Sequence, residues 1–529
     1  MGKLVSAREA VGIIKDGQTV AISGCLAWIA ADELLRALRE RFDATQSPRG
    51  ITAVFPVGTG DGGQIDGMNR LAKEGLLKRL IAGSLLSSPN PTTKQRPEIA
   101  RLVNENLIEA YAWPMGAMMH WLREVARRSP GYLTQVGFDT YADPVHGGTR
   151  LTACSPELVR RVDFDGRAYL YYPSCRVDVG LIRATSSDED GNLSFEEEPI
   201  LSAAPAIALA AKAGGGKVIA QVKYMVSRKR RKTQTVRVPG ALVDYVVHVP
   251  EQPMGSGFFH DESYLGGVPY HRTQLPVIPE GLDKLIMRRL ALDVSPGVVT
   301  IFGMGISTGV PLVMAELGLF DNGRLSNYSF TTEHGPYGGI VMPGRNFSAN
   351  QYADALLDGL EQFDAIDGGV CHTALLSFGE FGSDGCVNVS RLGQKTAGAG
   401  GFIDIAHNAT KLVLAGSFTA QGLEVGQGAG GLRILKEGRT RKFVKDVQHR
   451  TYPALTAVRE RGQSIKLVTE RAVFDLKDIG LVLTEIAPGI DVQRDILAHM
   501  EFAPAAIAEP LRKMDSTVFS GLPTAKGAL

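Results

Sequence analysis

Short apolar runs that end in glycine and are followed by segments of helical spacing recur along this chain. Residues 19–23 predict a strand, Gly24 a turn, and residues 31–41 a helix that carries leucines on one side. The same order returns at 296–303 and 311–317. Two copies of a strand, a glycine turn and a helix, separated by about half the chain, predict two related α/β halves rather than one extended sheet.

A second kind of apolar run is nearly continuous. Residues 217–222 and 243–247 lack the polar alternation of a half-exposed strand, so both are typical of a parallel sheet covered on its two faces. Further strands are expected in the second half of the chain at 374–377, 411–415 and 466–469.

A proline-containing connection separates the two halves. Residues 275–279 read Leu-Pro-Val-Ile-Pro, and each proline removes a backbone donor and fixes φ, which disfavours a helix or a central strand. We therefore expect an α/β fold of two related open α/β/α domains fused in one chain, the first over residues 1–278 and the second over residues 279–529. Each would be long enough to bury its own core.

Charge and hydropathy narrow the range of partners. The chain has 57 Lys and Arg against 56 Asp and Glu, so no global field attracts nucleic acid or anionic lipid. It has no apolar run of about 18 residues and no apolar signal-peptide core, so we expect a cytoplasmic protein without a membrane or nucleic-acid partner. For the basic run 228–232 a nucleic-acid patch, a phosphate contact and a solvated loop stay open, and the near-zero net charge favours the loop.

The cysteines do not indicate a metal or disulfide framework. There are five, an odd number, and none forms a Cys-x-x-Cys pair. We expect reduced thiols packed as small apolar groups and no metal site.

The candidate chemistry lies in residues 331–339, which read Thr-Thr-Glu-His-Gly-Pro-Tyr-Gly-Gly. Residues 325–330 predict a strand that runs into this loop, which places Glu333 at the strand's carboxyl end, where open α/β folds gather their chemistry. The glycines let a ligand come close. By itself, however, this stretch is more typical of a solvated acidic turn.

Other glycine-rich stretches offer alternatives. Residues 303–309 have the spacing G-x-G-x3-G rather than G-x-G-x2-G, so a tight turn with amides facing a ligand is favoured over a dinucleotide site. The glycines of 398–401 expose N–H groups that could converge on an oxyanion or a phosphate. The loops at 54–63 and 106–116 are interpreted singly as connections rather than as sites.

Several motifs, taken in order, carry a family resemblance. They are Glu333-x-Gly335 with Gly338-Gly339, Gly385 to Arg391 followed by Gly398-x-Gly400-Gly401-Phe402, and Glu-Ile-Ala-Pro-Gly-Ile-Asp at 485–491. Over residues 16–504 the chain resembles the family I coenzyme A transferases, specifically the single-chain acetate/propionate-type short-chain acyl-CoA transferases with fused α and β halves.

The resemblance implies that Glu333 is the catalytic carboxylate. It would form an acyl-glutamyl anhydride and then a glutamyl-CoA thioester, and a carboxylate needs no neighbouring base because it is ionised at neutral pH. Gly398, Gly400 and Gly401 would bind CoA and stabilise the oxyanions. The resemblance further implies acyl-CoA and carboxylate substrates, no cofactor because coenzyme A is a substrate, and a homo-oligomer, either a dimer or a tetramer.

Departures from the family pattern concern the substrate pocket. His334 stands where the family usually has a small or amide residue, Tyr337 where it has an aliphatic one, and Met115 precedes Gly116 where relatives commonly carry glutamine. A merely reshaped loop is the favoured interpretation at His334 and Tyr337, and the alternative is that these four residues form part of the substrate pocket. Two other functions stay open: an acyl-CoA hydrolase that uses the same glutamate, with His334 holding the water, and a nucleotide-binding or regulatory protein without turnover.

Overall fold

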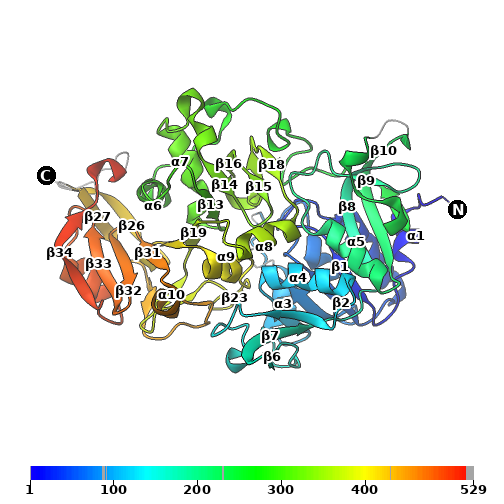
Figure 1. Ribbon diagram of the computed structural model, residues 1–529, viewed down its shortest axis with the longest axis horizontal. Coiled ribbons are helices and arrows are strands. Elements are labelled where there is room, and N and C mark those ends of the chain that lie inside the picture. The colour runs from blue at the N-terminus through cyan, green and yellow to red at the C-terminus, as the bar shows by residue number, and fades with distance from the viewer. Residues whose placement is uncertain (1, 86–89, 91, 229–231, 429–430, 520–529) are drawn as a thin grey trace.

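The structure is a computed structural model that describes residues 2–85, 90, 92–228, 232–428 and 431–519. Two large sheets lie side by side along the long axis of the molecule, the first formed by the blue-to-green part of the chain and the second by the green-to-red part (Figure 1). Within the described residues, no helix combines the length and apolar character that crossing a membrane requires.

The first sheet is built around a parallel core with the order β12-β10-β8-β1-β2-β3-β4. Its strands are β1 (Thr19–Ile22), β2 (Ile51–Phe55), β3 (Leu77–Ala82), β4 (Glu109–Ala112), β8 (Val179–Ser187), β10 (Lys217–Met225) and β12 (Tyr245–His248), extended by β9 (Leu193–Ser194) and β11 (Val236–Val238). Its helices are α1 (Ala7–Val11), α2 (Asp32–Thr45), α3 (Glu98–Asn104), α4 (Met115–Ala126) and α5 (Ala204–Ala213). A small antiparallel sheet of β5 (Gly131–Thr134), β6 (Arg160–Phe164) and β7 (Arg167–Pro173) is attached to it.

The second sheet has the order β18-β15-β14-β13-β19-β24-β31-β32-β33-β34, parallel from β14 to β31. Its strands are β13 (Val299–Phe302), β14 (Ser329–Thr331), β15 (Pro336–Tyr337), β18 (Ala355–Leu356), β19 (Thr373–Ser377), β24 (Lys411–Ala415), β31 (Ser464–Val468), β32 (Ala472–Lys477), β33 (Gly480–Ile486) and β34 (Ala506–Lys513). Its helices are α6 (Leu282–Ala291), α7 (Val310–Glu316), α8 (Gly359–Asp367), α9 (Phe402–Asn408) and α10 (Ala454–Arg461).

Smaller sheets accompany the second sheet. Their strands are β16 (Ile340–Val341), β17 (Asn350–Gln351), β20 (Glu380–Gly382), β21 (Cys386–Asn388), β22 (Arg391–Leu392), β23 (Lys395–Thr396), β25 (Thr419–Ala420), β26 (Glu424–Gly428), β27 (Gly431–Lys436), β28 (Thr440–Arg441), β29 (Phe443–Val444) and β30 (Tyr452–Pro453). Of these, β29-β20-β21-β30 form a four-stranded sheet, and the other strands form two-stranded sheets.

The apolar pattern of the sequence agrees with the burial of the strands, but it misplaced the start of the strand that leads to Glu333. All nine residues of β8 are buried, as a strand covered on both faces requires. The expected strand at 325–330 is wrong in its first part, because Asp321–Asn327 forms 3-10 turns in which Asn322 and Gly323 adopt positive φ. Only Ser329–Thr331 pairs with β13, so the strand that leads to Glu333 is short.

Two further expectations concern the connection and the basic run. The expected boundary at residues 278 and 279 lies between β12 and β13, just before α6, and the division into domains stays a prediction. Residues 229–231 of the basic run lie outside the described residues, whereas Arg228 pairs with Asp190 at 2.8 Å. The five cysteines are free, and Cys154 and Cys175 are exposed rather than packed.

The two sheets meet through helices. Helix α4 of the first half packs against α8 and α9 of the second, near the centre of Figure 1. A group that follows a strand of one sheet can therefore face a loop of the other.

Candidate active site

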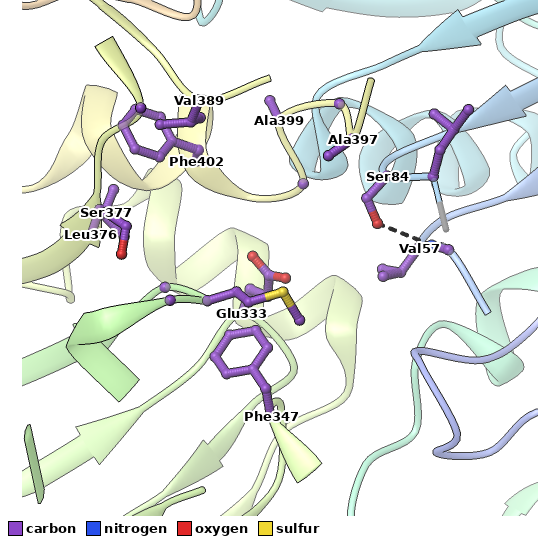
Figure 2. Close-up of a pocket in the computed structure, with 18 of the residues that line it drawn as sticks. Val57, Ser84, Glu333, Phe347, Leu376, Ser377, Val389, Ala397, Ala399 and Phe402 are labelled. Atoms are coloured by element: carbon purple, nitrogen blue, oxygen red, sulfur yellow. Dashed lines mark hydrogen bonds between the residues drawn. The ribbon is translucent and has the colours of Figure 1, made fainter. Parts of the chain in front are cut away.

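Glu333 lies two residues beyond β14, in the turn that leads to β15. Its side chain is 13% exposed, and that surface opens into a cavity of about 410 Å³. In Figure 2 the carboxylate lies between Phe347 and residues from both halves of the molecule. This placement excludes the interpretation of Glu333 as a solvated turn residue.

The cavity wall is formed by both halves. The first half contributes the segments that follow β1, β2 and β3, namely Cys25, Leu26, Val57, Gly58, Ser84 and Leu85. The second half contributes the turn after β13, the end of β19 and the glycine-rich turn before α9, including Gly303, Met304, Gly305, Leu376, Ser377 and Gly400. Carboxyl ends of parallel strands from two sheets thus face one another across the glutamate.

The glycine-rich turn is held in place by the first half. Leu85 N–H donates to Ala397 O at 2.8 Å, and Met115 N–H donates to Gly400 O at 2.9 Å. Ala399 N–H donates to the hydroxyl of Tyr141 at 3.2 Å. Because these contacts join distant parts of the chain, the position of the turn relative to Glu333 depends on the packing of the two halves.

One amide of this turn reaches the glutamate. Gly401 N–H donates to Oε2 of Glu333 at 3.0 Å. Burial raises the pKa of Glu333 from its ordinary value of 4.5 to about 7, although the bond from Gly401 acts in the opposite direction. A buried carboxylate that is still half ionised near neutral pH is suited to act as a nucleophile.

The expectation of several converging amides is corrected by this geometry. Gly400 N–H donates to Gly83 O at 3.0 Å, and Gly398 N–H donates to Ser390 O at 3.1 Å. Both residues line the cavity, but their N–H groups are already used to build the turn. In this structure, therefore, only Gly401 of the three predicted glycines points its amide at the carboxylate.

Comparison with known proteins now bears on the identity of this site. The family model described as Coenzyme A transferase matches residues 4–249. The chain is 37% identical to the acetate CoA-transferase YdiF of Escherichia coli strain K12, over 98% of this chain and 95% of that protein. It is 36% identical to the caffeate CoA-transferase of Acetobacterium woodii over the full length of both. This chain belongs to the coenzyme A transferase family.

The fold agrees with that assignment. A crystal structure of the acyl-CoA transferase YdiF from Escherichia coli O157:H7, in a thioester complex with CoA, superposes with a TM-score of 0.88 at 36% identity and covers 99% of this chain and 98% of that one. The apoenzyme of the same protein gives a TM-score of 0.89. The predicted α/β fold and the predicted family are both confirmed.

Two residues expected near the substrate of this coenzyme A transferase lie elsewhere. Met115 and Gly116 begin α4, and neither belongs to the cavity wall. Gly116 N–H donates to Oδ2 of Asp404 at 3.1 Å, and a Cβ at Gly116 would lie 2.3 Å from Oδ1 of the same residue. This glycine is therefore needed for the close contact between α4 and α9, and its place in the substrate pocket stays a prediction.

Tyr337 and His334, the other two residues expected in the pocket, also lie outside the cavity wall. Tyr337 lies in β15, which pairs with β14 and β18, and burial raises the pKa of its hydroxyl to about 12. His334 has no exposed surface. Because it cannot contact water in the cavity, the idea that His334 holds a hydrolytic water has no support here.

The sequence interpretation missed the first-half wall of the coenzyme A transferase site. The loop at 54–63 was interpreted as a connection, yet Val57 and Gly58 line the cavity. A signal was present: β1 and β2 are each followed within three residues by a glycine, Gly24 and Gly58. Glycines at the carboxyl ends of adjacent parallel strands mark the edge where a ligand binds.

The pKa of Glu333 predicts the pH dependence of this coenzyme A transferase. The nucleophile must be ionised, so with a pKa of about 7 we expect kcat/KM to fall about tenfold per pH unit below that value and to level off above it. Initial rates of acyl exchange over a range of pH check this. If kcat/KM instead fell only below about pH 4.5, the ordinary pKa of glutamate, the Glu333 side chain would be solvated in the free enzyme.

Proposed function

We propose that this coenzyme A transferase moves coenzyme A from an acyl-CoA to a free carboxylate through a thioester on Glu333. The observation that carries the proposal is a mostly buried carboxylate that accepts a bond from the Gly401 amide and opens into the cavity where the two halves meet. A carboxylate can attack a thioester without a base, and a site shielded from water protects the reactive intermediates.

The reaction divides into balanced steps. Oε2 of Glu333 adds to the thioester carbon, and the collapse of that adduct releases CoA as its thiolate and leaves an acyl-glutamyl anhydride. The thiolate then adds to the glutamyl carbon, which expels the first acid as a carboxylate and leaves the glutamyl-CoA thioester. A second carboxylate reverses these steps and departs as the new acyl-CoA. In these steps Glu333 is the group of the protein that forms and breaks covalent bonds.

The exposure of the wall residues suggests which parts of the cavity take the two parts of the substrate. Cys25, Val57 and Phe347 are 2%, 4% and 2% exposed, and we infer that they form a closed end. Met304 is 53% exposed and Lys395 is exposed, and we infer that they border an open end. Coenzyme A is far longer than the cavity and has to leave through the open end, which gives the closed end to the acyl group.

The closed end also selects among acids. Within the described residues of the cavity wall, Glu333 and Lys395 are the charged side chains, and Lys395 is exposed to solvent. A second carboxylate in the closed end would be desolvated beside Glu333 without a cation. Apolar monocarboxylates are therefore preferred over dicarboxylates of similar length.

The test combines trapping with an acceptor comparison. After incubation with an acyl-CoA and no acceptor, peptide mass spectrometry is expected to find a CoA-derived adduct on the peptide that holds Glu333. Propionate is then expected to form its CoA ester faster than malonate, which replaces the methyl group by a carboxylate. A wild-type peptide without adduct contradicts the thioester, and release of free CoA regardless of acceptor would identify a hydrolase instead.

A further inference from the structure

His334 has two ring nitrogens and no hydrogen bond to either in the described part of the chain. The side chain is completely buried, and both Nδ1 and Nε2 lack a partner. Leaving a buried donor unsatisfied is destabilising, so an orphaned imidazole calls for an explanation. Burial lowers the pKa of His334 to about 3, so the ring is neutral at physiological pH and carries one N–H.

One carboxylate oxygen of Glu333 lies near this unpaired ring. Nε2 of His334 lies 4.0 Å from Oε1 of Glu333. The hydrogen bond recorded for Glu333 goes to the other oxygen, Oε2. Because Oε1 carries negative charge when the glutamate ionises, it favours the tautomer with the proton on Nε2. A normal N–H···O distance is about 2.9 Å, so a relative shift of about 1 Å closes the bond.

The backbone around the imidazole is fixed. Thr332 Oγ1 donates to Ser348 O at 2.9 Å, and Leu357 N–H donates to Gly335 O at 2.9 Å. A Cβ at Gly335 would lie 2.3 Å from Leu357 O, so the turn after His334 is tightly packed. The imidazole is thus held in place, whereas the Glu333 carboxylate, which borders the cavity, has room to move.

We propose that His334 is a catalytic hydrogen-bond donor, whose Nε2–H binds Oε1 of Glu333 when that side chain is converted into the anhydride and thioester. This inference rests on the proposed function. Catalytic hydrogen bonds are commonly long in the free enzyme and shorten as the reaction proceeds. The bond then contributes more in the transition state than in the ground state, which is what accelerates a reaction.

The step served by this donor is the addition of the thiolate to the glutamyl carbon. The C–S bond forms, and the carbonyl π electrons move onto Oε1, opposite Nε2–H. When the adduct collapses, the C=O bond is restored and the first acid leaves with Oε2. The proton stays on His334 throughout. Gly401 N–H, which donates to Oε2, is then available to stabilise the tetrahedral adduct at the acyl carbon.

Three substitutions at His334 test this assignment. Glutamine places its amide nitrogen near the position of Nε2, asparagine places it near Nδ1, and alanine has no donor. We expect His334→Ala and His334→Asn to lower kcat on the order of 10²-fold with little change in KM, the effect typical of a lost oxyanion donor. His334→Gln is expected to recover most of the rate. His407→Gln, which changes another mostly buried histidine, is the matched control and is expected to leave kcat unchanged.

The readouts separate this role from a structural one. In the free enzyme His334 Nε2 and Glu333 Oε1 are 4.0 Å apart and form no hydrogen bond, so removing the imidazole should not change the pKa of Glu333. The fall of kcat/KM below pH 7 is therefore expected at the same pH in all three variants. Equal losses in the glutamine and asparagine variants, or a kcat within threefold of wild type in His334→Ala, would overturn the assignment. If Glu333→Gln still exchanged acyl groups, the proposed function itself would fail, whatever His334 does.

Discussion

Replacing Glu333 by glutamine is expected to abolish acyl exchange, with a loss on the order of 10⁵-fold, the scale found when a covalent nucleophile is removed. Glutamine has nearly the same size, so the cavity keeps its shape while the nucleophilic oxygen is lost. Initial rates of exchange between an acyl-CoA and a labelled carboxylate measure this. Glu333→Asp, which keeps the charge but draws it back by one methylene, is expected to retain more activity than Glu333→Gln.

Glu333→Gln is also expected to change how the thermal stability of the protein depends on pH. The pKa of Glu333 is about 7 in the folded protein against an ordinary value of 4.5, so the folded state binds this proton more tightly than the unfolded state. Stability contributed by this group is present below pH 4.5 and is lost as the pH rises through 7. Glu333→Gln is therefore expected to raise Tm at pH 8 and to leave it unchanged at pH 4. An inactive variant with lower Tm at pH 8 would indicate damage to the fold rather than loss of the nucleophile.

Gly401→Ala is expected to lower kcat by about 10²- to 10³-fold while the protein stays folded. Gly401 has φ −82°, which alanine adopts without strain, so the effect does not come from the backbone. The added Cβ would lie 2.4 Å from Oε2 of Glu333 and would push the carboxylate away from the Gly401 amide that binds it. Rates of exchange, together with the yield of the trapped thioester, measure the loss.

Gly359→Ala is the matched control for this variant. Gly359 is the first residue of α8, whereas Gly401 directly precedes α9, and a Cβ there would meet the flexible end of Met119 at 3.0 Å. Activity close to wild type is expected. If Gly401→Ala kept kcat within threefold, or if both variants lost activity equally, the role of the Gly401 amide would be contradicted.

The sequence was informative where chemistry depends on residues that are close together in the chain. The run around Glu333 contains the carboxylate, its glycines and the end of a strand within a few residues, and the order of three motifs identified the family. The capping box of α1, formed by Ser6 and Glu9, likewise depends on residues three positions apart. Such features depend on local spacing, which the sequence shows directly.

The interpretation failed where a residue's role depends on what packs against it. Met115 and Gly116 were possible pocket residues, because relatives commonly carry glutamine at the position of Met115, but they begin the helix that contacts Asp404. Gly400 was expected to offer its amide, but Gly83 O accepts it. In both cases the partner lies about 300 residues away in the sequence, and spacing carries no information about such contacts.

The sequence by itself determined the α/β class, the family and the identity of the candidate nucleophile, because strand periodicity, glycine turns and motif order are local properties. Tertiary structure decided everything that gives the glutamate its reactivity. Its burial, its bond from Gly401 and its unpaired neighbour His334 arise only when two sheets bring their strand ends together. Desolvation raises the pKa of a carboxylate through the low dielectric of surrounding groups, and those groups come from both ends of the chain.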